Sequence, residues 1–460
     1  MRRPLFVAAL FLVTIAAVRL KAGWAEEAPY GYISANQLET GGEYLIAGQV
    51  YQKNETSVYL KSVILSETNA NGQNDHGQNA HWQSSADSRH VNHVQETGKI
   101  QENIICETEE AQKIPLGSFL AVRGQFSAYS HATNPGEFDA AVYYRTLEVG
   151  GKLRKAVVLA RGEEYWHVRE WLYGLKCRLK ERLYRIFPEK EAAVMSALLL
   201  GDKSELDSDL KELYKRNGVL HILSISSLHI TIIGMSIYRL LRRTGLPIAP
   251  CALAGSVILI LYGCMTGFSV SACRAIGMYL IKMGAEVAGR TYDMLTALGV
   301  MGALMVLRNP FYLLNSGFLL SFTSVLGIGV VYPALEPQLP HGSAKKAPKG
   351  RADSGHPPAG WGGGRVREIL ASAAENGQNL GKSLVQSFFA SLSITLTTLP
   401  VQLWFYYEIP VYSVVLNLFV IPFLKPMMIT GLLAMLVPGL GILGMVDRLI
   451  LNGYEFLCSC

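Results

Sequence analysis

The distribution of hydrophobic and polar positions divides the chain into two parts. Charged residues are dense from Glu26 to Asn217, but only nine occur between Val219 and Val330, separated by long apolar runs. A run of about 20 apolar residues can cross the hydrocarbon core of a bilayer as a helix. The pattern therefore predicts a soluble N-terminal part followed by a polytopic bundle of α-helices in the membrane over residues 218–460.

Seven apolar runs mark the predicted spans of this membrane domain. They are residues 219–241, 246–262, 272–288, 294–307, 312–332, 388–407 and 411–446, the last of which forms one or two passes. Several are short for an upright crossing, which broken or re-entrant helices lined by protein allow.

The extreme N-terminus carries a further apolar segment. MRRPLFVAALFLVTIAAVRL sets two arginines before an apolar stretch, which predicts a transmembrane anchor over residues 1–22. The small residues after it leave a cleavable signal peptide as a second interpretation. In both cases the segment that follows is exported.

Residues 40–153 show the alternation of β-strands. Short runs such as YLIAGQVYQ and SVYLKSVIL are separated by glycines and prolines, and no long helical period appears. Their number and length predict a small β-barrel of the five-stranded OB-like type. Residues 66–99, rich in Asn, Gln, Ser and His, have too little apolar content for a core and are predicted to be a disordered insertion.

Residues 163–217 return to a helical period. YWHVREWLYGLKCRLKERLYRIF sets aromatic residues and leucines on one face and basic residues on the other. This amphipathic helical linker either lies on the membrane surface or packs on the barrel, and the pattern does not decide between the two.

Composition agrees with a membrane protein and gives its orientation. Half of the 460 residues are hydrophobic, 17% are charged, and the net charge is +6. Basic clusters at the N-terminus, after the first and third predicted spans, and in the loop 336–382 fall on one side if the passes alternate. The positive-inside rule predicts that this side is cytoplasmic, with the barrel outside. Seven cysteines form no CxxC pair or zinc spacing, so we expect no metal site and no cofactor.

Five collinear segments resemble the ComEC-type competence proteins, the inner-membrane channels of bacterial DNA uptake. They are NPGEFDAAVYYRTLEVGG, ALLLGDKSELDSDLKELYKRNGVLHILSISSLHI, TGFSVSACRAIGM, NPFYLLNSGFLLSF and TLTTLPVQLWFYYEIPVYSVVLNLFVIP. The resemblance covers most of the chain. It implies a multi-pass protein of the bacterial inner membrane that imports DNA during natural competence.

The chain departs from the family pattern at two points. Ser227 stands where the family usually has glycine in a Ser-Gly-Leu-His motif. Many members also continue into a metallo-β-lactamase-like domain, whereas this chain contains no His-x-His-x-Asp-His motif. We therefore expect no nuclease activity and no enzymatic role for this chain, with a separate nuclease as a possible partner.

The segment HILSISSLHITIIG carries the first candidate site residues. On a straight helix Ser226 and His229 share a face, with His221 not far around it. Polar side chains at membrane depth usually face a bundle interior or a water-filled cavity, so these three residues are predicted to line a DNA conduit. The alternative is that they only hydrogen-bond neighbouring helices.

Two further conduit residues come from TGFSVSACRAIGM. Arg274 offers a guanidinium to passing phosphates, or else it snorkels to the interface or caps a helix. Phe268 offers a ring on which bases can stack, although aromatic residues at this depth are more often interface anchors. A second set is predicted to shape the bundle as caps, helix breakers and small packing residues: Asp202, Ser227, Gly267, Ser271, Pro310, Gly317, Ser321, Phe322 and Pro400.

The functional prediction is a transmembrane channel that moves single-stranded DNA into the cytoplasm. Its expected partners are single-stranded DNA, membrane lipids, a DNA receptor and a cytoplasmic DNA translocation motor. Two alternatives remain. An intramembrane hydrolase using Ser226 and His229 would need an orienting acid that the span lacks. A small-molecule transporter would be expected to show internal repeats, which are not visible.

Overall fold

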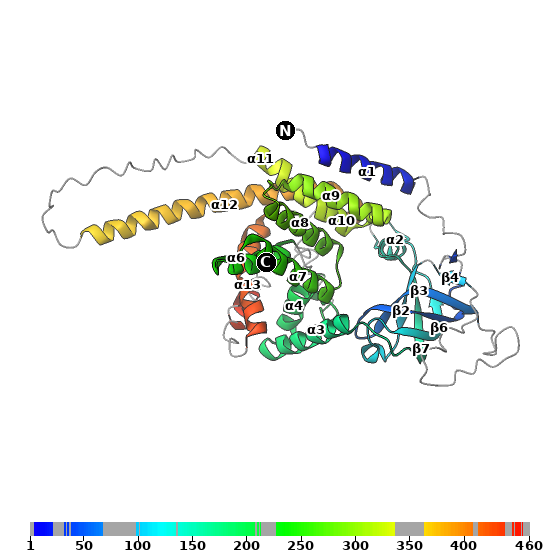
Figure 1. The fold of residues 1–460 in the computed structure, drawn as a ribbon. Coiled ribbons are helices and arrows are strands. Elements are labelled where there is room, and N and C mark those ends of the chain that lie inside the picture. The colour runs from blue at the N-terminus through cyan, green and yellow to red at the C-terminus, as the bar shows by residue number, and fades with distance from the viewer. Residues whose placement is uncertain are drawn as a thin grey trace.

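The structure is a computed structural model of the chain. It describes residues 4–21, 32–33, 35, 38–67, 98–100, 102–134, 137–207, 209–210, 212, 227–335, 363–407, 413–437, 444–445, 447–451 and 453. Of the predicted insertion 66–99, only the two ends, which belong to strands, lie within these residues. A barrel and a helical part lie side by side (Figure 1).

Five strands close into a barrel. They are β2 (Glu43–Lys53), β3 (Ser57–Glu67), β5 (Asn103–Glu107), β6 (Phe119–Ser127) and β7 (Val149–Arg161). Their order around the barrel is β3-β2-β6-β7-β5, and β5 closes the ring by pairing with β3. The β5–β7 pair is parallel and the other four pairs are antiparallel. The predicted boundary at 153 falls inside the barrel, because β7 continues to Arg161.

The barrel core follows from the alternation seen in the sequence. Ile46, Leu60, Leu120 and Leu153 come from four different strands and are fully buried. Side chains that alternate along each strand point to opposite faces, so one set fills the interior. The short strand β4 (Gly98–Ile100) pairs with Val63–Leu65 in the second half of β3, and the short strand β1 (Tyr32–Ile33) pairs with β4. Helix α2 (Ala140–Thr146) connects β6 to β7.

Helix α3 (His167–Ile186) contacts the barrel, in line with one of the two interpretations of its amphipathic pattern, and it also packs against α4 (Glu189–Leu200), α7 (Ile248–Thr266) and α13 (Ser413–Leu436). The ammonium of Lys53 is buried beneath it, donating to Ile114 O at 2.8 Å and to Glu170 Oε1 of α3 at 2.8 Å. The ring of Tyr173, also on α3, lies 4.4 Å from the same nitrogen. Burying a lysine side chain requires such partners, and these contacts join α3 to the barrel.

The second half of the predicted amphipathic linker contains helix α4 (Glu189–Leu200), which is buried and not amphipathic. Its residues from Ala192 to Leu200 are all buried, packed against α3 and against α13 (Ser413–Leu436). A helix that is apolar on every side belongs inside a protein core. The described residues of the predicted linker 163–217 thus include one helix that contacts the barrel and one within the helical part, and residues 208, 211 and 213–217 lie outside the described residues.

The remaining helices form the helical part. They are α1 (Pro4–Lys21), α6 (Ser227–Arg243), α7 (Ile248–Thr266), α8 (Val270–Val287), α9 (Met294–Arg308), η5 (Pro310–Leu314), α10 (Ser316–Leu326), η6 (Gly327–Val331), α11 (Tyr332–Leu335), α12 (Gly363–Tyr406) and α13. The predicted loop 336–382 is thus helical from Gly363 onward, and residues 336–362 lie outside the described residues.

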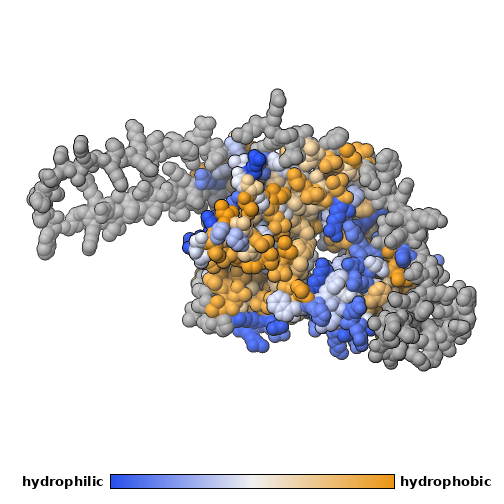
Figure 2. All heavy atoms as spheres, viewed as in Figure 1, coloured by the Kyte–Doolittle hydropathy of each residue, from blue (hydrophilic) through white to orange (hydrophobic). Residues whose placement is uncertain are grey.

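Three helical stretches within the described residues are long and apolar enough to cross a membrane. They are Ile248–Thr266, Ser316–Leu335 and Val385–Tyr406. Shorter apolar helices accompany them at Ala8–Val18, Met294–Arg308 and Pro426–Leu436. Hydrophobic residues cover most of the visible face of the helical part, whereas hydrophilic residues gather over the barrel (Figure 2).

The first helix of the chain packs against one formed much later. A Cβ atom at Gly299 of α9 would lie 3.0 Å from Phe6 Cδ2 and 3.3 Å from Ala9 Cβ, both on α1. Farther along, Ala16 joins a buried cluster with Val306 and Phe318. Glycine at 299 allows the close approach because it has no side chain.

Candidate functional site

The turn between α7 and α8 brings part of the TGFSVSACRAIGM segment against the barrel. Gly267 and Phe268 have φ angles of 85° and 48°, and both backbone N–H groups donate to Gly263 O at 3.0 Å. A Cβ at Gly267 would lie 3.8 Å from Gln52 Nε2, at the end of β2. A non-glycine residue such as Phe268 in the left-handed region is unusual, and such backbone strain is often found at functional sites.

Arg274 lies one helical turn beyond this point, enclosed by protein. Only 3% of its surface is exposed. Its Nη1 donates to the backbone oxygen of Ser321 on α10, and its guanidinium lies 5.7 Å from the ring centroid of Phe322. Phe322 in turn stacks on Phe318, with centroids 4.3 Å apart. The structure thus brings together Arg274, Ser321 and Phe322, which the sequence analysis had assigned separate roles.

No carboxylate among the described residues forms an ion pair with Arg274. Its Nε is buried and makes no hydrogen bond within this part of the chain. A guanidinium in a membrane domain is costly unless it is paired, so a charge held mainly by one carbonyl and one ring is a notable arrangement. Ser271 lies in the first turn of the same helix, which Ser269 caps by accepting from Ala272 N at 3.3 Å.

Only part of the HILSISSLHITIIG segment can be located. His221 and Ser226 lie outside the described residues, and Ser227 is the first residue of α6. His229 is fully buried in the same helix. Neither His229 nor Arg274 is therefore exposed to water in this structure.

The segment after α9 joins the helical part to the barrel. Asn309 caps η5, which begins at Pro310, and donates through Nδ2 to Thr146 O at 3.0 Å. Asn315 caps α10 and donates to Thr146 Oγ1 at 2.7 Å. All three polar residues are buried, so these bonds fix the end of α2. Gly317 lies in the first turn of α10, and Pro400 lies inside α12.

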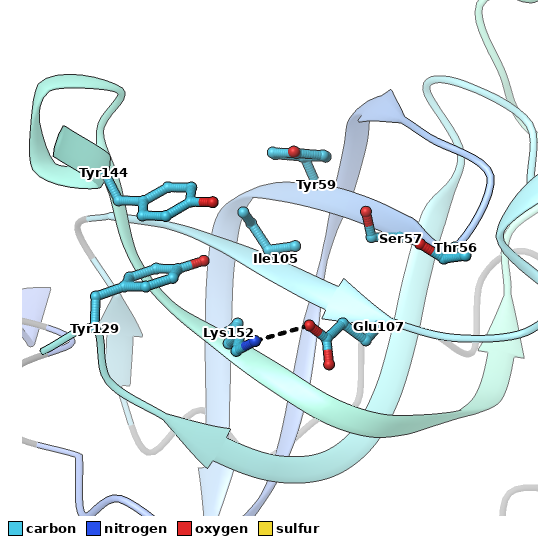
Figure 3. A pocket seen from close by; sticks show the side chains of 8 residues that line it. All are labelled: Thr56, Ser57, Tyr59, Ile105, Glu107, Tyr129, Tyr144 and Lys152. Carbon is cyan, nitrogen blue, oxygen red and sulfur yellow. Dashed lines mark hydrogen bonds and ion pairs between the residues drawn. The ribbon is translucent and has the colours of Figure 1, made fainter. Parts of the chain in front are cut away.

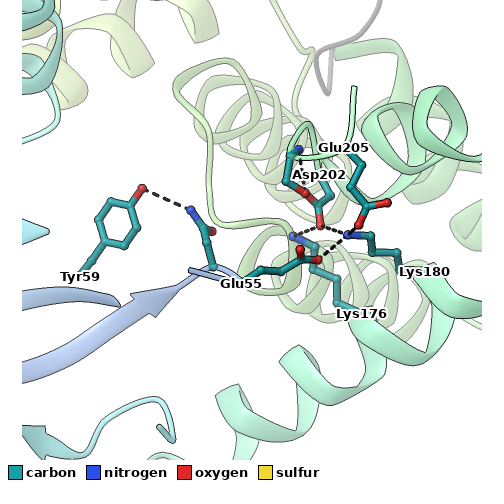
Figure 4. A network of polar contacts seen from close by, with 8 residues as sticks. Glu55, Tyr59, Lys176, Lys180, Asp202 and Glu205 are labelled. Carbon is teal, nitrogen blue, oxygen red and sulfur yellow. Dashed lines mark hydrogen bonds and ion pairs between the residues drawn. The ribbon is translucent and has the colours of Figure 1, made fainter. Parts of the chain in front are cut away.

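Asp202 lies in a network of charges between the barrel and the helical part (Figure 4). Its carboxylate is 3.5 Å from Lys180 and 3.8 Å from Lys176, both on α3, and accepts two bonds from Ser204. Lys180 also contacts Glu55, in the turn between β2 and β3, and Glu205, each at 2.6 Å.

The surroundings of this network shift its pKa values. Burial alone would raise the pKa of Asp202, but Lys176, the bonds from Ser204 and Lys180 lower it overall. Burial alone would likewise lower the pKa of Lys180, but Glu205, Glu55 and Asp202 raise it. Asp202 and Lys180 therefore stay charged at neutral pH. The network ties the barrel to the segment after α4.

A polar pocket on the barrel was missed by the sequence analysis. It has a volume of about 350 Å³ and is lined by Thr56, Ser57, Tyr59, Ile105, Glu107, Tyr129, Tyr144 and Lys152 (Figure 3). Lys152 donates to Glu107 at 2.9 Å, and the rings of Tyr129 and Tyr144 stack with centroids 3.9 Å apart. Burial above all raises the pKa of Tyr59 and Tyr129, so their hydroxyls remain protonated.

The signal for this pocket was present but spread over five segments. Tyr144 lies in NPGEFDAAVYYRTLEVGG, whereas the other lining residues come from segments far apart in sequence. Within the described residues, no group of three or more His, Cys, Asp or Glu side chains is arranged to hold a metal ion.

Comparison with known proteins identifies the family. The profile described as Competence protein matches residues 198–460, which is more than half of the chain. The chain belongs to the competence protein family. It is 22% identical over 328 residues to ComE operon protein 3 of Bacillus subtilis, covering 71% of this chain and 37% of that protein. It is 23% identical over 242 residues to Recombination protein 2 of Haemophilus influenzae, covering 49% and 29% respectively.

The match confirms the predicted resemblance to ComEC-type competence proteins. The aligned region spans well under two thirds of either relative, at 37% and 29% of their lengths. No solved structure matches the chain. Membership of the competence family implies a role in competence and, together with the apolar helices, a membrane protein.

Proposed function

We propose that this competence protein is a channel that imports single-stranded DNA across the bacterial inner membrane into the cytoplasm. The observation that carries the proposal is Arg274, a guanidinium buried between two apolar helices with no carboxylate partner among the described residues. Phosphate charge dominates the interaction of proteins with nucleic acids, and arginine presents a planar fork that suits phosphate. A buried, uncompensated arginine therefore suits a strand that brings its own negative charge.

The barrel is proposed to receive the strand. Its five strands close into a ring in which one pair, β5–β7, is parallel. These are the third and fifth strands of the barrel in chain order, and this topology supports an assignment to the OB type. In that type the face of the second and third strands and the neighbouring loops bind oligonucleotides. The polar pocket is lined from β3, β5 and the turn before β3, which correspond to these positions.

The helix ends support an orientation with the barrel outside. The α7–α8 turn lies by Gln52, and Asn309 at the end of α9 bonds to Thr146. Because α7, α8 and α9 alternate in direction, Arg243 and Arg290 belong to the ends farthest from the barrel. Basic residues gather on the cytoplasmic side of membrane proteins, so the far side is proposed to be cytoplasmic.

Since Arg274 and His229 are both buried, the proposed channel is closed in this structure. Transit would require α8 and α10 to separate, which breaks the bond between Arg274 and Ser321 O. We further propose that this chain has no nuclease activity of its own and that a DNA receptor, a translocation motor and a separate nuclease complete the machinery. An intramembrane hydrolase is less well supported, because it would need an orienting acid that the span lacks and because His229 is enclosed.

The test is transformation frequency, normalised to folded protein in the membrane, in a host whose DNA uptake depends on this chain. Arg274→Ala should abolish uptake, and Arg274→Lys should retain part of it because it keeps the charge without the planar fork. Arg239→Ala is the matched control, since Arg239 is exposed on the membrane-domain helix α6. Normal uptake with Arg274→Ala would refute the proposed role of Arg274 in DNA transit.

A further inference from the structure

Four aromatic rings form a continuous row on the barrel, from the pocket to the barrel surface. Tyr129 stacks on Tyr144 with centroids 3.9 Å apart, Tyr144 meets Tyr143 at 5.4 Å, and Tyr143 meets Phe138 at 5.1 Å. We call these four residues the aromatic ladder. Its inner end forms a wall of the pocket (Figure 3), while Phe138 and Tyr143 are 64% and 39% exposed.

The outer end of the ladder is held in position although it is exposed. Asp139 caps α2 by accepting from Val142 N at 2.9 Å, and Glu137 accepts from the backbone and hydroxyl of Thr133. The other end of α2 is fixed through Thr146 to the buried asparagines of the helical part. Exposed rings on a fixed backbone keep contact area without a large loss of entropy on binding.

The ladder also lies beside the helical part. Arg145, next to it on α2, has its guanidinium carbon 4.8 Å from the ring centroid of Phe311 in η5. Burial, followed by the neighbouring hydroxyls of Tyr144 and Tyr406, raises the pKa of Tyr143, and Tyr406 is the last residue of α12. Tyr406 in turn donates to Ser316 Oγ at 3.0 Å, at the start of α10. The ladder therefore leads from the pocket toward the helix ends that face the barrel.

The charge around the ladder suits a polyanion. Residues 137–161, from the outer end of the ladder through α2 and β7, contain five basic residues and three acidic ones, and Lys152 of β7 lines the pocket. Rings in series beside a basic strand are the combination that proteins use to bind single-stranded nucleic acid without sequence preference, because every base has a face that can stack. In a duplex the bases are already stacked on one another and offer no free face.

We propose that the aromatic ladder is a stacking platform for the unpaired bases of single-stranded DNA. Bases stack on Phe138 and Tyr143 while the basic residues of β7 contact the phosphates, and the strand is directed toward the barrel-facing ends of α10 and α12. This inference rests on the proposed function, because it assumes that the barrel meets single-stranded DNA before transit.

The experiment measures binding of a fluorescent oligothymidine to the full chain in lipid nanodiscs, single-stranded or annealed to its complement. Phe138→Ala and Tyr143→Ala should each weaken binding of the single strand about tenfold, and should leave duplex binding unchanged. Tyr143→Phe keeps the ring and should bind as the natural chain does. Tyr165→Ala is the matched control, because Tyr165 is also 39% exposed but lies outside the ladder.

Three results would overturn the inference: unchanged single-strand binding in both ladder variants, an equal loss in Tyr165→Ala, or an equal loss of duplex binding. Thermal melting of each variant shows whether a loss of binding comes from unfolding. If the natural chain binds DNA and supports uptake while the ladder variants are normal, only the ladder fails. If the natural chain neither binds nor imports DNA, the proposed function fails with it.

Discussion

At the scale of single residues, the turn between α7 and α8 makes a prediction about stability. Gly267 has a φ angle of 85°, which a residue with a Cβ adopts only with strain. Gly267→Ala should lower the free energy of unfolding by about 1–2 kcal/mol. Gly284→Ala is the matched control, because Gly284 lies inside α8 with no heavy atom within 4 Å of its would-be Cβ.

The control should be neutral or stabilising by about 0.5–1 kcal/mol, since alanine is the better helix former. The measurement is the midpoint of thermal unfolding in detergent for both variants and the natural chain. Equal effects of the two substitutions would show that the left-handed turn contributes nothing particular to stability.

Residue chemistry was partly predictable from the sequence. Arg274 was recognisable because a charge in an apolar run requires an explanation. Its partner was not recognisable, since the backbone oxygen of Ser321 lies 47 residues away and carries no signal in the sequence. The pocket was missed for the same reason: Lys152 and Glu107 meet only because β5 pairs with β7.

At the scale of elements, the network between α3 and the β2–β3 turn predicts a pH dependence. The pKa of Asp202 is lowered in the folded chain, so its contribution to stability is present above its unfolded pKa and is lost as pH falls through the folded value. Glu205 behaves in the same way, because its contact with Lys180 outweighs the effect of burial on its pKa.

We therefore expect the barrel to detach more readily below about pH 4, the region in which such carboxyls titrate. Energy transfer between labels on the barrel and on α4 should fall on acidification. In the Lys180→Met variant, energy transfer between the labels should already be lower at pH 7, and its further fall on acidification should be smaller. If energy transfer in that variant falls on acidification as much as in the natural chain, other carboxyls cause the detachment.

Helices and strands were predictable where a single hydrophobic periodicity dominated the segment. The strands of the barrel followed from alternation, and α7, α8 and α9 lie within a few residues of the predicted spans. Helix α4 was misassigned as part of an amphipathic linker, because only its neighbour α3 has a polar face. An apolar run of its length fits a buried helix as well as a linker, and only the packing against α13 distinguishes them.

At the scale of the whole molecule, the orientation can be tested by labelling. In a background with the seven native cysteines replaced, Glu163→Cys on the barrel side should react with an impermeant thiol reagent on intact cells. Arg290→Cys, in the exposed turn between α8 and α9, should react only after the membrane is permeabilised. Reaction of the second position alone on intact cells would invert the proposed orientation.

The packing of α1 on α9 sets the order in which the protein can be completed during its synthesis. The ribosome releases α1 first, but the surface that receives Phe6 and Ala9 includes Gly299, which emerges only after the whole barrel has been translated. Until then α1 lacks its final neighbour. Folding of the barrel and docking of α1 are consequently separate events in time, because α9 is made only after the barrel.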